Sequence, residues 1–520
     1  MTVRGTKRRP AAATLAGVAL ACASGFLAPG ALAQALEGRV TRVALENGMR
    51  FLIVRRGTAP VFSATLTFRV GSVDDQGGKT GLAHLFEHLA FKGTSIIGTR
   101  DAAKEAEILD SLDRVASDLN RELDRGQRAD PKRLDTLREQ MRGVEEKEES
   151  LVVKDELARI LSSNGAAGLN ASTGQDLTSY VVGLPSNRLE LWCLIEAARL
   201  KDPVLREFYS ERDVVMEEHR MRYDSQPTGK LYEQLLLAAF QEHPYRVSAG
   251  GFMSDLGRLT RPQAVAFHTT YYVPGNAVGA IVGDVDPVAA ERLLRRYFGG
   301  LPTGPQPPQP PTSEPPQQGE RRINVEFDAE PEVMIAFHKP NWPSPDDPVF
   351  EVIDSLLTSG RTSRLFRKLV VETQVASGVS SFEAPGDRFP NLFIVSAEPR
   401  APHTAAEVEQ AVLLELQRLS KEPVEEAEMR KVRSQLEASF LYPLRSNQGL
   451  ASQISYFEIL DGDWRDLLRY RDVLLTVTPA QVQDVVRRTL TPSNRTVAVL
   501  TRPAVRQGAP PAGAAPQGGR

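Results

Sequence analysis

The sequence predicts two mixed α/β halves joined by an extended linker. Its 520 residues exceed what one ordinary hydrophobic core supports, so two or more domains are expected. A Pro-x-Asn turn before a valine-rich strand occurs twice, at residues 274–282 and 492–500, which indicates an internal duplication. Between the halves, residues 301–321 are rich in proline and carry no apolar period, which is typical of an extended linker.

The amino terminus, residues 1–33, is similar to a secretory signal. Basic residues precede an apolar run from 11 to 27, and Ala31-Leu32-Ala33 is a typical cleavage site. A membrane anchor is the alternative, but glycine and proline interrupt the run. Cys22 allows a lipoprotein, although the residues before it match such a signal poorly. We therefore expect a secreted, periplasmic protein without a transmembrane segment after cleavage.

Loss of the signal would change both charge and cysteine content. It removes four positive charges and no acids, so the formal net charge moves from −3 to −7, which argues against nucleic acid as a partner. It also leaves Cys193 as the only cysteine, so no internal disulfide can form. Cys193 lies in a mostly apolar segment at 189–200 and is expected to be a buried small hydrophobe.

The first half is expected to begin with strands. Residues 43–45 and 49–54 flank Glu46-Asn47-Gly48, which is a hairpin signal. Apolar residues alternate with polar ones from Phe62 to Val70, as they do in a strand with one buried face. The first half then closes on the strand predicted at 277–282.

Residues 102–149 predict an antiparallel helical hairpin. Apolar residues recur at three- and four-residue spacing from 108 to 123 and from 134 to 144, and a breaker at 126–131 separates the two runs. Its charges are mixed and show no single binding face. We therefore expect either a rest for a partner or substrate, or a passive loop that can be excised without loss of the neighbouring site.

The segment His84-Leu85-Phe86-Glu87-His88 has the spacing of a metal site. On a helix, His84 and His88 lie one turn apart on the same face, so both imidazoles can reach one metal ion. Glu87 lies beside that face, where a carboxylate can take a proton from zinc-bound water. The alternative is a helix with two solvent-exposed histidines and an ordinary surface glutamate.

A second helical run, residues 207–220, offers a third ligand. Glu211 and Glu218 are seven residues apart and share one face, so Glu218 can bind metal while Glu211 supports the site. Glu217 and His219 each point about 100 degrees away from Glu218 and are expected to be solvated. The alternative is an ordinary acidic surface helix.

Together these segments resemble the pitrilysin/insulinase family of zinc peptidases. The family's Gly-Leu-Ala lead-in, its inverted H-x-x-E-H motif and the following F-K-G-T are present within residues 81–94. Its E-R-x-V-x-x-x-E helix is present at 211–218. Residues 169–173 resemble the family's N-A-x-T edge strand, and without the resemblance they predict only a short strand beside glycine.

The resemblance implies particular roles for these residues. One zinc ion per chain would be held by His84, His88 and Glu218, with Glu87 as general base and Glu211 in support. A substrate backbone would add as a further strand along the edge formed by Asn170, Ala171, Ser172 and Thr173.

The fold that the resemblance implies is two homologous α+β domains that close like a clam. Each domain is a mostly antiparallel sheet with helices on one face. We therefore expect a catalytic zinc-binding domain at 34–300, with the helical hairpin as an insertion, and a metal-free domain at 322–504. Residues 505–520, rich in Gly, Pro and Ala, are expected to form a disordered tail.

The implied function is a secreted zinc metalloendopeptidase that hydrolyses peptides or unfolded protein segments through zinc-activated water. A non-catalytic or weakly active peptide-binding subunit of a peptidase heterodimer is the alternative. The intact motif favours the enzyme, because a scaffold subunit does not need a complete set of ligands and a base. A zinc hydrolase that acts on substrates other than peptides is a third reading.

The second half contains no metal motif. Residues 359–369, its equivalent of the metal helix, lack His and Glu. The remaining histidines are scattered singly and are expected to be surface or packing residues, namely His243, His268, His338 and His403. One zinc site per chain is therefore expected.

The second half also departs from the family pattern. Many active relatives carry an arginine and a tyrosine seven residues apart that bind the substrate carbonyl, and Val370 and Ser377 occupy those places here. Neither side chain can replace these donors, whose loss typically costs a factor of about a hundred or more in rate. We therefore expect a paired subunit, either a homologous partner chain that carries the missing arginine and tyrosine or a second copy of this chain in a homodimer that uses other donors, such as Arg361, Arg364 or Tyr442. The alternative is that nearby groups replace these donors within one chain.

Overall fold

The computed structural model describes residues 36–310 and 312–503. The expected signal peptide, Cys22 and the expected C-terminal tail lie outside the described residues. The described residues from Arg39 onward belong to one compact unit, and the following description concerns that unit.

The first half is built on a mixed six-stranded sheet in the order β1-β2-β6-β3-β5-β4. The predicted hairpin is confirmed, because β1 pairs antiparallel with β2 and Val43 lies opposite Phe51. Only the β2–β6 pair is parallel, and β4 forms one edge of the sheet. The strands are β1 (Val40–Ala44), β2 (Arg50–Arg55), β3 (Val61–Phe68), β4 (Ala167–Thr173), β5 (Thr178–Pro185) and β6 (Ala277–Gly283).

The helices of the first half pack against the sheet, and apolar residues from both form one large core. Cys193 lies in this core, as the sequence predicts, and burial raises the pKa of its thiol to about 12. Besides the helices described below, this half contains α2 (Leu82–Leu89), α6 (Leu189–Lys201), α7 (Phe208–His219), α9 (Met253–Leu256), α10 (Arg261–Tyr271) and α11 (Pro287–Phe298).

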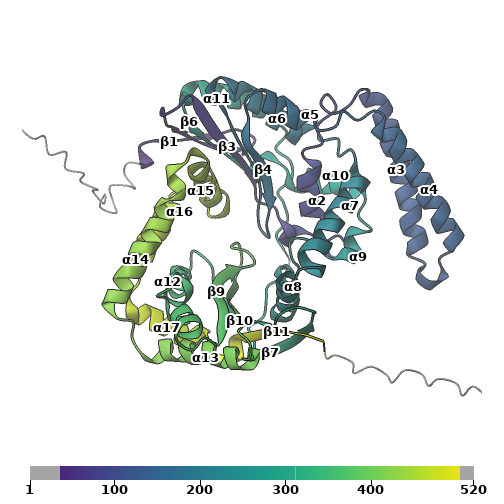
Figure 1. Ribbon diagram of the computed structural model, residues 1–520. Helices are drawn as coiled ribbons and strands as arrows, with labels where there is room; N and C mark the ends of the chain where they lie inside the picture. The colour runs from purple at the N-terminus through teal and green to yellow at the C-terminus, as the bar shows by residue number, and fades with distance from the viewer. Residues whose placement is uncertain (1–35, 311, 504–520) are drawn as a thin grey trace, which may run out of the picture. The chain divides into compact units, whose positions relative to one another are not determined.

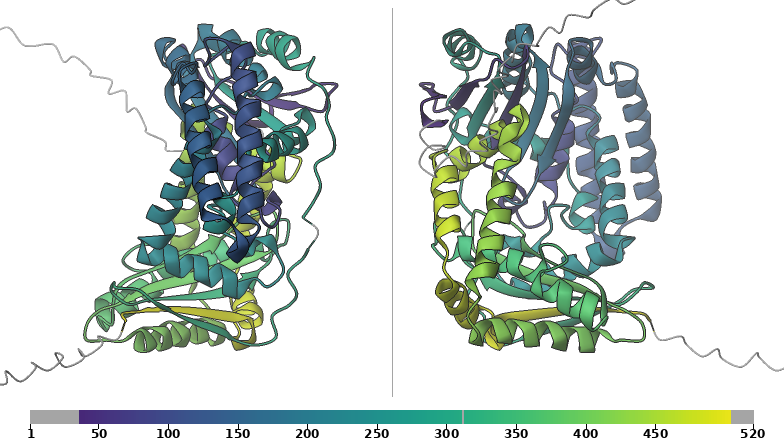
Figure 2. Two further views of the ribbon diagram at one scale, coloured as in Figure 1. Left: turned by 90° about the vertical axis from the view of Figure 1, so that its right-hand side faces the viewer. Right: turned by 60° about the vertical axis from the view of Figure 1, so that its left-hand side comes forward.

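A helical hairpin made of α3 (Ala102–Leu123) and α4 (Pro131–Glu149) packs side by side at the edge of this half (Figure 2). Each helix has a side-chain cap at its N-terminus, because Asp101 accepts the backbone N–H of Lys104 and Asp130 accepts that of Lys132. The short helix α5 (Glu156–Ser163) leads from the hairpin back to β4.

The second half is built on a five-stranded sheet in the order β7-β11-β8-β10-β9. Only β7 and β11 run parallel. The strands are β7 (Arg321–Glu326), β8 (Glu332–Lys339), β9 (Ala376–Ala384), β10 (Asn391–Pro399) and β11 (Arg495–Thr501). The helices are α12 (Asp347–Thr358), α13 (Ala405–Lys421), α14 (Glu426–Leu441), α15 (Asn447–Leu460), α16 (Asp466–Thr476) and α17 (Pro479–Thr489).

The repeated Pro-x-Asn turn has the same structure in both halves. Asn276 donates its side-chain amide to the carbonyls of Tyr271 and Arg69, at 2.9 and 3.1 Å. Asn494 donates in the same way to Thr489 and His338, at 2.8 and 2.9 Å. In each half the asparagine thus joins the end of a helix to a neighbouring strand, and this equivalence supports the internal duplication.

Each half also places one helix on the sheet of the other half (Figure 1). Helix α8 (Pro227–Ala239) follows the first-half helix α7 but buries Leu231, Leu235 and Leu236 against β7, β8 and β11. Helix α15 belongs to the second half but packs on β3 and β6, where Ser455 lies 3.3 Å from Thr67. Packing therefore does not follow the division of the chain at its proline-rich linker.

No helix among residues 36–310 and 312–503 is long and apolar enough to cross a membrane. The predicted α+β class with two sheets is confirmed.

Candidate metal centre

Helix α2 holds His84, Glu87 and His88 on a rigidly seated turn. The carboxylate of Asp75 accepts the backbone N–H groups of Gly81 and Ala83, at 2.8 and 3.0 Å, and so caps the start of the helix. Gly81 has a φ of 84°, and a Cβ at that position would lie 2.6 Å from the side chain of Leu256. The glycine of the motif is therefore required both by its backbone conformation and by close packing.

Helix α7 brings Glu218 to the two histidines. Its carboxylate oxygen Oε2 lies 3.6 Å from Nε2 of His84 and 3.7 Å from Nε2 of His88. One donor atom from each residue lies within 4.8 Å of the other two, and no other group of three acidic, histidine or cysteine side chains in the described part of the chain meets this condition. The three expected ligands therefore converge on one point.

The chemistry of these donors fits a zinc ion. Two imidazoles and one carboxylate form a common ligand set of catalytic zinc sites, with room for a further ligand. Burial, and then the charges of His88 and Arg222, lower the pKa of His84 to about 4, so its imidazole is neutral as a metal ligand must be. Nδ1 of His84 is also buried without a hydrogen-bond partner among the described residues.

Glu211 supports His88 from behind, as the sequence predicts. Its Oε2 lies 3.4 Å from Nδ1 of His88, which is the arrangement that orients a ligating histidine. Lys92 holds the same carboxylate through a 2.6 Å ion pair and contacts Glu207 at 3.1 Å. Burial opposes a charged His88, but the hydrogen bond and charge of Glu211 outweigh it together with Glu218, so the pKa of His88 is raised.

Glu87 lies between the metal cluster and the edge strand β4. Burial raises the pKa of its carboxyl group, while a hydrogen bond from Thr173 and the charge of His88 act in the opposite direction. Thr173 is the last residue of β4, whose outward-facing Asn170 and Ser172 are exposed. Because β4 is an edge strand, an extended peptide can pair with it and pass in front of Glu87.

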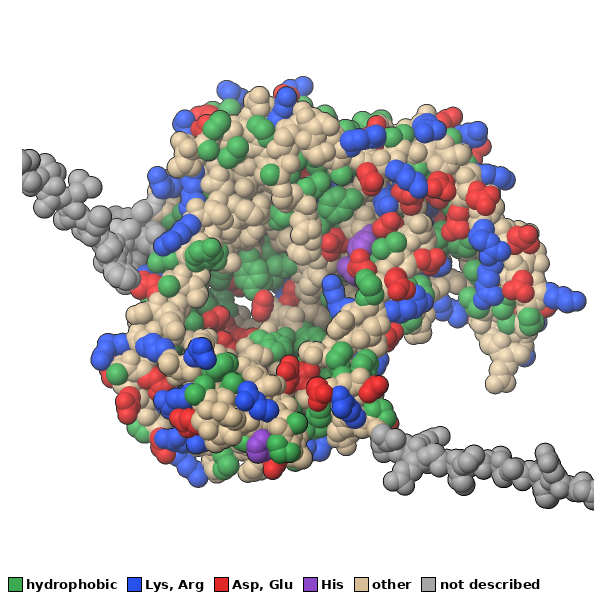
Figure 3. Space-filling view, in the orientation of Figure 1, with side chains coloured by type: hydrophobic (Ala, Val, Ile, Leu, Met, Phe, Trp, Pro, Cys, Tyr) green, Lys and Arg blue, Asp and Glu red, His purple; other side chains and the backbone are tan. Residues whose placement is uncertain are grey.

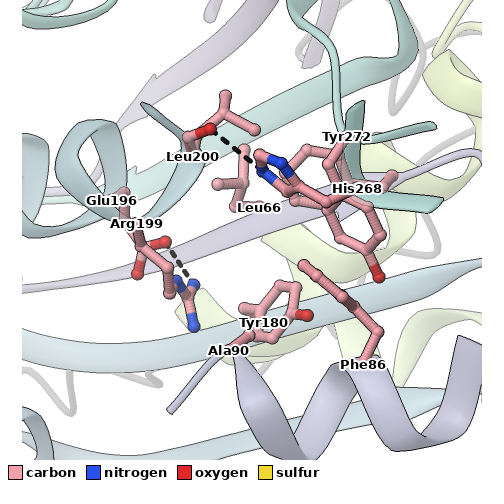
Figure 4. Close-up of a pocket in the computed structure, with 10 residues that line it drawn as sticks. Leu66, Phe86, Ala90, Tyr180, Glu196, Arg199, Leu200, His268 and Tyr272 are labelled. Atoms are coloured by element: carbon pink, nitrogen blue, oxygen red, sulfur yellow. Dashed lines mark hydrogen bonds and ion pairs between the residues drawn. The ribbon is translucent and has the colours of Figure 1, made fainter. Parts of the chain in front are cut away.

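An aromatic cluster fixes the back of α2 (Figure 4). The ring of Phe86 lies 4.1 Å from that of Tyr272, and Arg199 stands 4.0 Å from the ring centre of Tyr180. Nε2 of His268 donates to the carbonyl of Leu200, at 3.1 Å, and burial lowers the pKa of His268 to about 4. The cavity left among these side chains measures only about 10 Å³, so α2 has little freedom to shift.

Arg206 organises the loop that follows the metal helix. Its guanidinium is fully buried, forms an ion pair with Glu105 at 2.8 Å and donates to the carbonyls of Thr94 and Ile97 at 2.7 and 2.8 Å. It also donates to the carbonyl of Lys92. The F-K-G-T segment is therefore held by a side chain that lies beside the start of α7.

The two ends of the helical hairpin contact Arg206 and the residue that follows it. Glu105 belongs to α3, and Glu148 of α4 accepts the backbone N–H of Glu207 at 2.7 Å. Excision of residues 102–149 would leave Arg206 buried without its counter-ion. That excision of the hairpin leaves zinc bound, because no candidate ligand lies within it, stays a prediction. Both ends of the hairpin contact the segment that leads into α7.

The two sequence neighbours of Glu218, Glu217 and His219, differ in exposure to solvent. Glu217 is exposed and pairs with Arg220 at 2.9 Å, in agreement with the expected register. The prediction that His219 is solvated is wrong, because His219 is only 5% exposed and its Nε2 lies 3.0 Å from the carbonyl of Gly251. The helix turns into a π-helical segment at Arg220–Asp224 directly after His219, and this places the imidazole inside the protein.

The second half offers few of the expected substitute donors. Val370 packs against the second core, and the hydroxyl of Ser377 donates to Glu398. Arg364 is held by two bonds to Glu428, at 3.0 and 2.7 Å, which removes it as a free donor. Tyr442 remains 73% exposed.

Arg222 is a cation whose charge acts on the candidate metal site and which the sequence did not indicate. It is exposed, and its charge acts on both His84 and Glu87. A basic residue four positions after an expected ligand is a weak signal on its own, because the π-helical segment that turns it cannot be read from local spacing.

Fold and site together define a two-domain α+β protein with a histidine–histidine–glutamate cluster and an adjacent carboxylate on the inverted motif. The family model described as Insulinase (Peptidase family M16) matches residues 50–122, and the model described as Peptidase M16 inactive domain matches residues 258–436. Each half of the chain therefore matches a model of this peptidase family.

Known relatives agree with this assignment. The chain is 27% identical over 453 residues to "Zinc protease PqqE" of Helicobacter pylori, which covers 86% of this chain and 88% of that protein. The crystal structure of a protease from Helicobacter pylori has a TM-score of 0.74 at 24% identity and covers 89% of this chain and 99% of the other. The periplasmic protease PqqL from Escherichia coli has a TM-score of 0.66 at 16% identity, covering 89% and 48%.

Proposed function

We propose that the chain is a secreted zinc metalloendopeptidase that cleaves peptides or unfolded protein segments in the periplasm. The observation that carries the proposal is the convergence of His84, His88 and Glu218 within 4.8 Å beside Glu87. The name of the Helicobacter pylori relative and the periplasmic location of PqqL support the activity and the compartment.

In the proposed reaction, one set of residues would hold the zinc ion and another would keep those ligands in place. A bound zinc ion would polarise the scissile carbonyl and lower the pKa of its water to about 7. His84, His88 and Glu218 would hold that ion, while Glu211 and Lys92 fix the ring of His88.

Glu87 would act first as a general base and then as a general acid. Its carboxylate would accept a proton from the attacking water and then deliver it to the leaving amine. Thr173 hydrogen-bonds this carboxylate from the end of β4, so the base and the peptide-binding edge keep a fixed relation. The edge formed by Asn170, Ala171, Ser172 and Thr173 would orient the peptide by main-chain hydrogen bonds.

A second candidate function is a weakly active or non-catalytic peptide-binding subunit that works with a homologous chain. Val370 and Ser377 favour this candidate, because Val370 has no donor group and the hydroxyl of Ser377 is already bonded to Glu398. The partner would be a related chain that carries the missing arginine and tyrosine, or a second copy of this chain.

One set of assays separates the two candidates. The purified chain is assayed at low concentration for zinc content and for cleavage of a mixed peptide library, with and without a chelator. Chelator-sensitive cleavage that is independent of concentration and absent in Glu87→Gln supports the enzyme acting alone. Zinc binding with negligible cleavage, restored by a co-purifying homologue, supports the paired subunit. Full zinc occupancy without cleavage under either condition would refute the peptidase.

A further inference from the structure

A cavity of about 570 Å³ lies in the second half, away from the histidine cluster. Side chains from α12, β9, α14, α15 and α16 line it. On the face shown in Figure 3, acidic side chains gather in the hollow at the middle of the molecule. None of the residues expected to bind metal or substrate lines this cavity, so it has no role in the proposed chemistry so far.

The cavity carries much more negative than positive charge. Six carboxylates line it, from Asp347, Glu351, Asp354, Glu383, Asp387 and Asp461. Lys339 forms ion pairs with Asp347 and Glu383, and the charge of Arg69 acts on Asp461. Oε1 of Glu383 is buried and has no hydrogen-bond partner among the described residues.

The other four carboxylates have no ion pair among the described residues. Asp354 and Asp387 accept hydrogen bonds from the hydroxyls of Ser381 and Tyr456, at 2.5 and 2.6 Å. Glu351 and Asp461 line the same space, and neither side chain forms a hydrogen bond with another side chain in the described part of the chain. Such a group of partly buried like charges is costly unless a positive charge joins it.

The raised pKa values of three of these carboxyl groups agree with the shortage of positive charge in the cavity. Burial, and then the charge of Asp354, raises the pKa of Glu351 to about 6. Burial likewise raises the pKa of Asp354 to about 6, and that of Glu383 to about 8 despite Lys339. A cationic guest would favour the ionised form of each carboxyl group.

Aromatic rings form the remaining wall. Trp342 and Tyr470 lie 5.3 Å apart, and Phe457 lies 6.3 Å from Tyr470. Tyr456 continues the row at 5.3 Å from Phe457. Aromatic faces beside carboxylates suit a guanidinium or ammonium group on an aliphatic stem, which can stack and form ion pairs at the same time.

A metal ion fits this cavity less well. In the described part of the chain, only the histidine cluster brings three potential ligand atoms within 4.8 Å of one another. The carboxylates of the cavity are therefore spread around its wall instead of meeting at a point. That distribution matches an extended cation with several donors.

The cavity also adjoins the peptide-binding edge. Asp176 lies three residues beyond Thr173, a distance of about 10 Å at most for extended chain. Its carboxylate accepts the backbone N–H groups of Asp387 and Arg388, at 2.6 and 3.1 Å. Asp387 lines the cavity, so the end of β4 and the rim of the cavity are joined through this one carboxylate.

We propose that this cavity receives an arginine or lysine side chain of the peptide that lies along β4, so that the chain selects cationic peptides. The proposal rests on the proposed peptidase function for the placement of the peptide. Its chemistry depends only on the residues that line the cavity.

The test compares two labelled peptides that differ at one position, arginine in one and the neutral isostere citrulline in the other. Binding is measured by fluorescence anisotropy with the full-length zinc-loaded chain carrying Glu87→Gln, which prevents cleavage. We expect the arginine peptide to bind about tenfold more tightly, the effect of one charge-assisted hydrogen-bonded contact. Adding Glu351→Gln or Asp461→Asn should reduce this ratio to about threefold or less, since each removes one carboxylate.

Glu425→Gln is the matched control, because Glu425 is exposed at the start of α14 and does not line the cavity. Equal binding of the two peptides, or an unchanged ratio in both cavity variants, would overturn the proposal. Displacement of the arginine peptide by calcium ions at a stoichiometry of one per chain would overturn it in favour of a metal site. Asp461 is exposed, so its variant tests the proposal even where Glu351→Gln fails to fold.

The proposed function and this inference can fail separately. A chain without chelator-sensitive cleavage that still prefers arginine, and loses that preference in the cavity variants, supports the cavity and refutes the peptidase. A chain that cleaves both peptides equally well and binds them equally supports the peptidase and refutes the cavity.

Discussion

Replacement of Glu105 by glutamine should destabilise the first half although Glu105 lies outside the metal motif. The change keeps the size of the side chain but leaves the guanidinium of Arg206 without a counter-ion. Arg206 is 0% exposed and Glu105 1% exposed, so water cannot compensate. Removal of one partner from a buried ion pair typically costs about 3–5 kcal/mol.

The structure favours the upper part of that range. Two bonds join Arg206 to Glu105, at 2.8 and 3.1 Å, and the same guanidinium positions the carbonyls of Lys92, Thr94 and Ile97. A tilt of the unpaired guanidinium toward water would break these bonds as well. We therefore expect about 4–5 kcal/mol from Glu105→Gln. Zinc occupancy should fall only slightly, because Lys92 also holds Glu211.

Urea unfolding followed by fluorescence measures the change, and hydrogen exchange over residues 92–98 shows whether the loop opens. Glu107→Gln is the control, since Glu107 is exposed on the same helix and should change stability by no more than about 0.5 kcal/mol. If the two variants differ by less than about 1 kcal/mol, with equal exchange over the loop, the assigned role of the buried pair is wrong.

Further substitutions test the site itself. Glu87→Gln should keep zinc and fold but abolish cleavage, because an amide cannot accept the proton; wild-type turnover would exclude Glu87 as the base. Glu218→Gln should lower zinc occupancy, measured by mass spectrometry, far more than Glu217→Gln or Glu211→Gln, and a larger effect of Glu217→Gln would refute the ligand assignment. Arg222→Gln should lower kcat by a factor of about a hundred at unchanged zinc content if its cation replaces the missing donors, and an unchanged kcat would exclude that role.

Local spacing was enough to predict which candidate residues share a face on each of the two helices. His84, Glu87 and His88 share one turn, and Glu211 and Glu218 share one helix face, so helical geometry alone sets most of their relations. The meeting of the two helices came only from the resemblance, since nothing in a single helix specifies its partner. The edge strand at Ala167–Thr173 was identified in the same way.

The supporting contacts could not be predicted, because they join residues far apart in sequence. Glu105 and Arg206 are 101 positions apart, and an isolated charge on a helix gives no sign of burial. The exchange of α8 and α15 between sheets was missed for a related reason. An apolar helix face indicates that the helix packs against something, but not which of two sheets it covers.

The position of α8 links the second half to the candidate metal site. Glu218 lies near the end of α7, and the chain passes through the π-helical segment Arg220–Asp224 directly into α8, which is seated on the second sheet. The joint is tight, since a Cβ at Gly229 of α8 would lie 1.9 Å from the carbonyl oxygen of Arg222. Glu218, the proposed third ligand, therefore lies beside a segment that continues into the second half, whereas both histidines lie on a helix packed within the first half. A hinge motion that widens the entrance for a peptide would therefore either bend the segment Arg220–Asp224 or move Glu218 away from the histidines. Access of a peptide to the site and binding of the metal would then depend on the same segment.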